Sequence, residues 1–192
     1  MRILSLSFLL GLFFLCSPIL NAQELPEWQN LSVVTQNTEA PRSTFYVYDS
    51  EEEAVENAYY KSKNLLLLNG TWKFNLADTP EQRPKDFYQP DFKTNDWDDI
   101  NVPGDWQMQG YDFPLYVSAG YTHAINPPFV DTIYNPIGSY KREFKIPKDW
   151  KAKQIKLYFG GVTSVFYVWI NGKKVGYDED AKTPSEFDIT SF

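Results

Sequence analysis

The sequence predicts an all-β protein, an antiparallel sandwich, and three observations carry that prediction. Apolar and polar residues alternate with a period of two in several segments of the second half of the chain, as in strands with one buried face. An Asn-Gly pair separates two of these segments, and this dipeptide is a strong hairpin signal. Aromatic residues make up 17% of the 192 residues, which is enough to build an apolar core and argues against a disordered chain.

Residues 1–22 are predicted to be a secretory signal peptide. A short basic start, Met1-Arg2, precedes an apolar run over residues 3–15, and Ala22 offers a small residue for cleavage; this order is typical of export signals. The apolar run is shorter than the roughly 20 residues that a membrane-spanning helix needs. We therefore expect an exported protein, periplasmic or extracellular, with a retained anchor as the alternative.

Residues 23–60 are predicted to form an N-terminal arm, irregular over 23–48, with one short helix. Ser50 followed by Glu53 is a capping-box pattern, in which each side chain satisfies a free backbone N–H at the start of a helix. The pattern predicts a helix over 51–63. Its expected apolar face consists of Ala54, Val55, Ala58 and Tyr59.

Residues 61–192 are predicted to form one β domain. Residues 165–170 are apolar on both faces, which favours a central strand. Asn171-Gly172 follows at once and predicts a type I′ hairpin turn, because both turn positions need a positive φ. The expected strands cover residues 70–76, 139–146, 154–159, 165–170 and 173–177, with a further alternation that begins at Phe187 and Ile189.

A long segment between the strands, residues 102–135, is predicted to be an ordered loop. It is rich in proline, which removes ladder donors and excludes a central strand. It is also rich in aromatic residues, and long ordered loops in compact domains are usually functional. Two interpretations stay open: a loop packed by its own side chains, or a loop that lines a ligand site on this or a neighbouring domain. Aromatic rings would suit a sugar.

The composition excludes several classes of protein. One cysteine cannot form a disulfide scaffold, and one cysteine with one histidine cannot form a Cys/His zinc cluster. A formal net charge of −7 disfavours a general nucleic-acid binder, because an acidic chain repels phosphate. The length is too short for a complete large enzyme.

Four ordered stretches resemble the N-terminal domain of family 2 glycoside hydrolases, specifically the large β-galactosidases. The resemblance covers about residues 60–192, and the spacing between the stretches also agrees. The stretches are Val102 to Tyr116 (VPGDWQMQGYDFPLY), Asn126 to Val130 (NPPFV), Asn135 to Tyr140 (NPIGSY), and Asn171 to Tyr177 (NGKKVGY) leading to Pro184 to Asp188 (PSEFD).

The resemblance implies a galactose-binding-like jelly-roll β-sandwich, the sugar-binding domain of such enzymes. In the full-length family this domain precedes an immunoglobulin-like domain and a catalytic barrel. Hydrolysis there is retaining, with one glutamate as acid/base and a second as nucleophile, and both lie in the barrel. We therefore expect no catalytic residue in this chain, no glycosidase activity from it alone, and a jelly roll that is incomplete at its C-terminal edge.

The resemblance also implies two substrate-binding residues. Ser118 stands where the well-known β-galactosidases have an asparagine that contacts the galactosyl unit, and Tyr116 lies just before it. Serine keeps one hydroxyl, but it is shorter than asparagine and lacks the two amide donors.

Expected cofactors and partners follow from the same resemblance. Full-length members can use magnesium and sodium ions, whereas we expect no metal site and no cofactor in this chain. The expected partners are a β-galactoside or another carbohydrate and the downstream domains of the same enzyme, with no nucleic acid and no membrane after signal removal. The leading hypothesis is thus the N-terminal fragment of an exported β-galactosidase. The alternative is a stand-alone carbohydrate-binding module.

Overall fold

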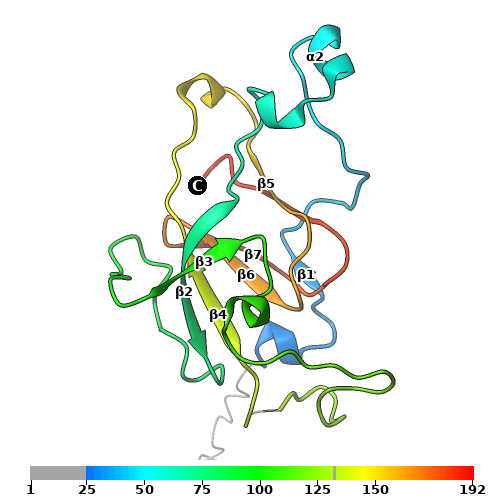
Figure 1. Cartoon of the computed structure of the whole chain (residues 1–192), viewed down its shortest axis with the longest axis vertical. Helices are drawn as coiled ribbons and strands as arrows, with labels where there is room; N and C mark the ends of the chain where they lie inside the picture. The colour runs from blue at the N-terminus through cyan, green and yellow to red at the C-terminus, as the bar shows by residue number, and fades with distance from the viewer. Residues whose placement is uncertain (1–24, 132) are drawn as a thin grey trace, which may run out of the picture.

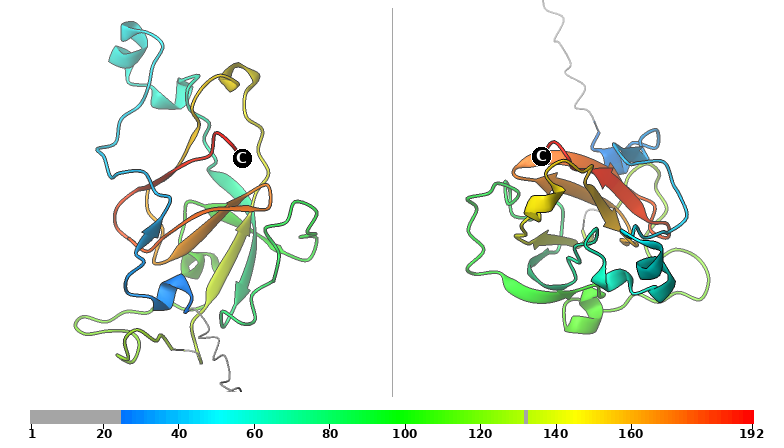
Figure 2. Two further views of the ribbon diagram at one scale, coloured as in Figure 1. Left: turned by 180° about the vertical axis from the view of Figure 1, so that it is seen from behind. Right: turned by 90° about the horizontal axis from the view of Figure 1, so that it is seen from above.

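The computed structural model describes residues 25–131 and 133–192, so the predicted signal peptide lies outside the described residues. Strands are the main regular structure of the described chain, and they are arranged in two layers, as the all-β jelly-roll prediction requires (Figures 1 and 2). None of its helices is long and apolar enough to cross a membrane. The strands are β1 Thr35–Gln36, β2 Gly70–Ala77, β3 Asp98–Val102, β4 Ile137–Lys141, β5 Lys156–Phe159, β6 Phe166–Ile170, β7 Lys173–Asp178 and β8 Ser185–Asp188.

The first layer is an antiparallel sheet of order β3-β2-β4. Phe74 in the central strand lies opposite Asp98 of β3 and Tyr140 of β4, and it is almost fully buried. The strand predicted over 70–76 is therefore confirmed. Strand β3 was not predicted, because Asp98-Asp99-Ile100-Asn101-Val102 carries only two apolar residues and takes its structure from pairing with β2.

The second layer contains the sheets β1-β7-β6 and β5-β8. Strands β6 and β7 form the predicted hairpin, and Asn171 and Gly172 have φ values of 52° and 83°. The prediction of a central strand at 165–170 is wrong within the described residues, because β6 pairs only with β7. Its second apolar face instead holds aromatic contacts, since Trp169 stacks on Tyr88 with ring centroids 5.2 Å apart.

The arm is more regular than predicted. Its strand β1 pairs with β7, and two residues after the end of β1, Thr38 forms a bridge with Phe187 of β8. The amide side chain of Asn37, between these two points, donates to the Val175 carbonyl at 2.8 Å. The arm thus connects the two sheets of the second layer, a role that depends on distant strands and that its own polar sequence does not indicate.

The predicted helix is present but short. Helix α2 covers Glu51–Glu56, and the Ser50 hydroxyl accepts a bond from the Glu53 N–H at 3.2 Å, as the capping box requires. Asn57 then adopts φ 50° and ends the helix, because a left-handed residue is a common helix terminator. Of the expected apolar face, Val55 is 78% exposed, and Tyr59 lies beyond the end of the helix, where it stacks on Tyr46 with ring centroids 4.4 Å apart.

Buried apolar side chains lie on both layers: Phe74, Ala77 and Ile100 on the first, and one larger cluster on the second. Val168 of β6, Val175 of β7, and Phe187 and Ile189 at the end of the chain form one buried cluster. Apolar side chains that pack against this cluster stay partly exposed, and they are Phe144, Ile155, Leu157, Phe159, Phe166 and Ile170.

Glu27 anchors the start of the arm and gives the fold a pH dependence. Its carboxylate accepts hydrogen bonds from Tyr167 at 2.8 Å and from Lys174. Partial burial opposes the charge, but these bonds outweigh it and lower the pKa of Glu27 to about 2 from 4.5. A carboxyl group with a lower pKa in the folded state adds stability above its unfolded pKa and loses it below.

We expect the free energy of unfolding to fall as the pH drops from about 4.5 toward 2, with Glu27 contributing on the order of 2 kcal/mol. Urea unfolding of the wild type and Glu27→Gln at pH 7 and pH 3 measures this contribution. The difference in free energy of unfolding between the wild type and Glu27→Gln should be smaller at pH 3 than at pH 7. An equal difference at both pH values would contradict the assignment.

Candidate functional site

One glutamine, Gln109, fixes the start of the long loop after β3. The Gln109 side chain accepts a hydrogen bond from the Asn101 N–H at 2.8 Å and donates one to the Asn101 carbonyl at 3.0 Å. It thus adds one pair of hydrogen bonds to the edge of β3. Gly104 makes room for this contact, because a Cβ there would lie 2.8 Å from the Gln109 amide nitrogen. The root of the loop is therefore fixed against the first sheet.

An aromatic cluster supports the same root. The Phe74 ring packs edge-on to Tyr111, with centroids 4.8 Å apart, and also contacts Trp106 and Tyr140. Gly138 lies beneath them, and a Cβ there would come within 2.9 Å of three of these rings. Burial, with a smaller contribution from Asp105, raises the pKa of Tyr140 to about 12. This cluster gives the loop a rigid base.

The C-terminal end of the loop returns to the first sheet. Phe113 and Tyr134 stack with centroids 5.6 Å apart, and the Tyr134 hydroxyl donates to Asp112. Burial and this hydrogen bond raise the pKa of Tyr134 to about 12. The Asn135 N–H then donates to the Asp78 carbonyl at 3.0 Å, next to the end of β2. The loop thus leaves and rejoins the first sheet through ordered contacts.

The tip of the loop presents both predicted substrate-binding residues to solvent. Tyr116 is 87% exposed, and Ser118 is exposed two residues later. Figures 1 and 2 show this segment extending away from the two layers. Exposure alone does not test their role in sugar binding, which stays a prediction.

Apolar exposure is the feature of this loop that sequence reasoning missed. Sequence reasoning singled out its aromatic residues, but the structure also exposes aliphatic side chains beside them. Clusters of exposed apolar side chains commonly mark interaction surfaces. The most exposed are Met108, Tyr116, Tyr121, Ile125 and Ile133.

The acidic run after β7 forms a turn. The buried Asp178 carboxylate accepts from the Asp180 N–H at 3.0 Å and from the Ser185 hydroxyl. Asp180 in turn accepts from the N–H groups of Lys182 and Thr183. Both carboxylates therefore accept hydrogen bonds from within the turn. The described residues contain no group of three or more His, Cys, Asp or Glu side chains that could hold a metal ion.

The anchoring role of Gln109 predicts a local effect. In Gln109→Ala, two hydrogen bonds to Asn101 are lost, each worth about 1 kcal/mol, and the loop becomes easier to open. Limited proteolysis should cut residues 110–135 faster than in the wild type. Met108→Ala is the matched control, since the Met108 side chain is 80% exposed. Equal cleavage rates for the two variants would contradict the role.

The loop and its supports coincide with the region in which this chain matches known proteins. The sequence profile of the glycosyl hydrolases family 2, sugar binding domain, matches residues 65–192, which is more than half of the chain. The chain belongs to glycoside hydrolase family 2. The resemblance predicted over residues 60–192 is thereby confirmed.

Curated relatives support the family 2 membership and show how much of them this chain represents. A β-galactosidase of Priestia megaterium is 43% identical over 176 residues, which are 89% of this chain and 17% of the relative. A β-galactosidase of Psychromonas ingrahamii is 39% identical over 164 residues, or 85% of this chain and 16% of the relative. The chain thus spans about one sixth of the length of these relatives.

Solved structures of β-glucuronidases also align with this chain. A calcium-binding mutant of Bacteroides uniformis β-glucuronidase 2 aligns with a TM-score of 0.48 and 25% identity, over 66% of this chain and 13% of that chain. A β-glucuronidase of Bifidobacterium dentium, complexed with coumarin-3-O-glucuronide, aligns with a TM-score of 0.45 and 24% identity over 65% of this chain and 17% of that chain.

Proposed function

We propose that this chain is the N-terminal sugar-binding domain of an exported β-galactosidase. In this proposal it folds at the start of a longer enzyme that removes terminal β-D-galactose residues by the retaining mechanism of family 2. The chemistry resides in a catalytic domain, and the loop over residues 102–135 reaches toward that domain to complete its sugar site.

The observation that carries the proposal is the 43% identity, over 89% of this chain, to a protein named β-galactosidase. The geometry supports it in a second way. The loop is fixed at its root by Gln109 and the Phe74 cluster, while its tip exposes Tyr116 and Ser118. A rigid base with an exposed polar and aromatic tip suits a loop that contributes contacts to a neighbouring site.

We expect the isolated chain to hydrolyse no nitrophenyl β-galactoside. A chimera in which it replaces the matched 176-residue region of the Priestia megaterium relative should hydrolyse that substrate. In the chimera, Ser118→Ala should raise KM by about 2- to 10-fold, the loss of one hydrogen bond. Thr122→Ala, at another exposed position of the loop, is the control and should leave KM unchanged.

Two results would contradict the proposal. Hydrolysis by the isolated chain would show that it carries catalytic groups of its own. A folded chimera without activity, beside an active intact relative, would show that this chain does not serve a β-galactosidase.

A stand-alone carbohydrate-binding module is the second candidate, and the exposed ring of Tyr116 favours it, because aromatic faces stack on sugars. Calorimetric titration of the isolated chain with lactose distinguishes the two. Binding that Tyr116→Ala abolishes would support the module, and no binding is expected of a domain whose sugar site needs other domains.

Export is part of the proposal and rests on residues 1–22. Expression of the full chain in a bacterial host should yield a mature protein that begins at Gln23, in the periplasm or the medium. N-terminal sequencing measures this. Magnesium and sodium enter the proposal as ions of the full-length enzyme, bound outside this chain.

A further inference from the structure

The tip of the long loop has little packing of its own. Every residue from 113 to 127 is exposed, and none of residues 113–125 shares a backbone hydrogen bond with another residue that the structure describes. A segment with few buried contacts and few hydrogen bonds has low local stability. The order of Tyr116 and Ser118 in this tip therefore depends on how the two ends of the loop are held.

Two side-chain contacts join the two ends of the loop at its neck, which consists of Asp112, Phe113, Tyr134 and Asn135. The Tyr134 hydroxyl donates to the Asp112 carboxylate, 22 positions away in the sequence. The Tyr134 ring stacks on Phe113, with centroids 5.6 Å apart and an interplanar angle of 11°. Hydrogen bonds to carboxylates are among the stronger ones in proteins. The hydroxyl of Tyr134 thus fastens one end of the loop to the other.

The backbone of Asp112 shows why this residue type suits the neck. Asp112 has a φ of 58°, in the left-handed region that few residues other than glycine, asparagine and aspartate visit readily. Asp112 therefore turns the chain and also supplies the acceptor for Tyr134. Asparagine is a second residue type that can do both, because it tolerates the same φ and has a carbonyl oxygen in its side chain.

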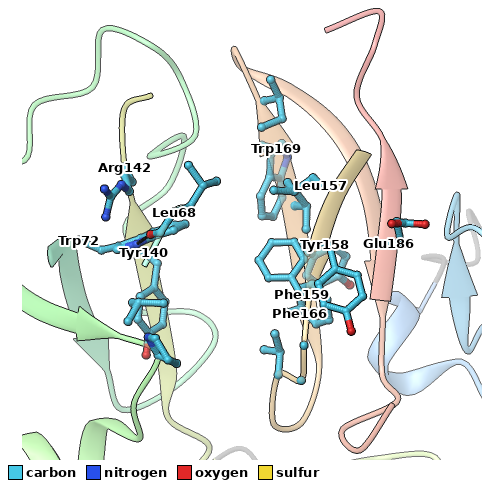
Figure 3. A pocket seen from close by; sticks show the side chains of 18 of the residues that line it. Leu68, Trp72, Tyr140, Arg142, Leu157, Tyr158, Phe159, Phe166, Trp169 and Glu186 are labelled. Carbon is cyan, nitrogen blue, oxygen red and sulfur yellow. Dashed lines mark hydrogen bonds between the residues drawn. The ribbon is translucent and has the colours of Figure 1, made fainter. Parts of the chain in front are cut away.

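The surroundings of the neck provide only partial support. Asp112 is half-buried, and Asp112 and Asn135 border the open space between the two layers, which Figure 3 shows with Tyr140 on one wall and Phe166 on the other. The backbone adds one hydrogen bond on the returning side, from the Asn135 N–H to the Asp78 carbonyl at 3.0 Å. Closure of the neck therefore relies on the side-chain contacts between its two ends.

We propose that Asp112 and Tyr134 are positioning residues, which close the neck of the loop and thereby hold its tip in the conformation that binds the sugar. The inference rests on the proposed function and deepens it by naming the contact that sets the sugar affinity of the loop. A loop with an open neck spends less time in the binding conformation, and the apparent affinity falls in proportion.

One substitution removes the hydrogen bond alone, and the chain offers a matched control for it. Tyr134→Phe deletes the hydroxyl and keeps the ring that stacks on Phe113. Tyr88→Phe deletes a similar bond, since the Tyr88 hydroxyl donates to Asp86 at 2.9 Å and Asp86 has a φ of 57°. Tyr88 and Asp86 are only two positions apart, so their bond closes no long loop.

The first readout is the mobility of the tip in the chain itself. Chymotrypsin should cut after Tyr116 and Tyr121 about 3- to 10-fold faster in Tyr134→Phe than in the wild type, because cleavage follows the population of the open loop. Tyr88→Phe should be cut at the wild-type rate. Asp112→Asn should also stay near the wild type, whereas Asp112→Ala should match Tyr134→Phe.

The second readout is sugar affinity in the chimera with the Priestia megaterium relative. We expect Tyr134→Phe to raise KM for a nitrophenyl β-galactoside about 3- to 10-fold and to leave kcat within about 2-fold of the wild type. Asp112→Asn should restore a KM that Asp112→Ala raises. A purely structural defect would lower the amount of active enzyme and its unfolding midpoint without this split between KM and kcat.

Three outcomes would overturn the inference. They are equal cleavage rates in Tyr134→Phe and Tyr88→Phe, an active chimera whose KM does not respond to Tyr134→Phe, and an Asp112→Asn variant that behaves like Asp112→Ala. Faster cleavage of Tyr134→Phe beside a folded but inactive chimera would refute the proposed function alone. An active chimera beside unchanged cleavage would refute the closed neck alone.

Discussion

Gly176→Ala is expected to destabilise this protein by about 3 kcal/mol or more, at the upper end of what overpacking costs. Gly176 lies in β7, beside the arm strand β1 that pairs with it. A Cβ at this position would lie 2.5 Å from Cε1 of Phe187 and closer still to the Gln36 carbonyl oxygen. Neither atom can yield easily, because the oxygen belongs to the backbone of β1 and the Phe187 ring is fully buried.

Urea unfolding at pH 7, followed by circular dichroism, measures the effect. Gly161→Ala is the matched control, because the nearest atom to a Cβ there is the Ala181 carbonyl oxygen at 4.0 Å, an ordinary contact. We expect the control to stay within about 0.5 kcal/mol of the wild type. A similar midpoint for the two variants would show that the arm does not pack against β7 as described.

Local signals in the sequence predicted the local parts of the fold correctly. Asn171-Gly172 encodes its own turn through φ values that these residues tolerate, so the β6–β7 hairpin needed no tertiary information. The Ser50 cap likewise depends on a group only three residues away. The end of α2 was missed because Asn57, a residue that tolerates the left-handed region, stops a pattern that otherwise continues.

Features that depend on distant partners could not be predicted. Thr35-Gln36 is polar and only two residues long, and it becomes a strand because β7 offers backbone groups to it. The same reason explains β3, whose two aspartates conceal the alternation. The edge position of β6 follows from which strands lie beside it and not from the apolarity of its two faces.

The candidate site likewise has features that local sequence predicted and features that depend on distant residues. Proline and aromatic content identified the loop over residues 102–135, and the resemblance placed Ser118 and Tyr116 in it. The anchor Gln109 was not predicted, because its bonds to Asn101 arise only when the loop folds back on β3. Whether Ser118 and Tyr116 contact a sugar stays a prediction.

Phe187→Ala is expected to cost about 3–5 kcal/mol, the range for removal of a buried aromatic side chain. Phe187 is fully buried and belongs to the core cluster with Val168, Val175 and Ile189. Its ring packs edge-on against Phe159 and Phe166, with centroids 6.2 and 6.1 Å away. The substitution therefore removes apolar area and also opens a cavity between β5, β6 and β8.

Phe129→Ala is the control for this prediction, since the Phe129 side chain is 49% exposed in the long loop and should contribute less than about 1 kcal/mol. Thermal unfolding by calorimetry compares both variants with the wild type. If Phe187→Ala and Phe129→Ala lost equal amounts of stability, the stabilising core would instead lie outside the second layer.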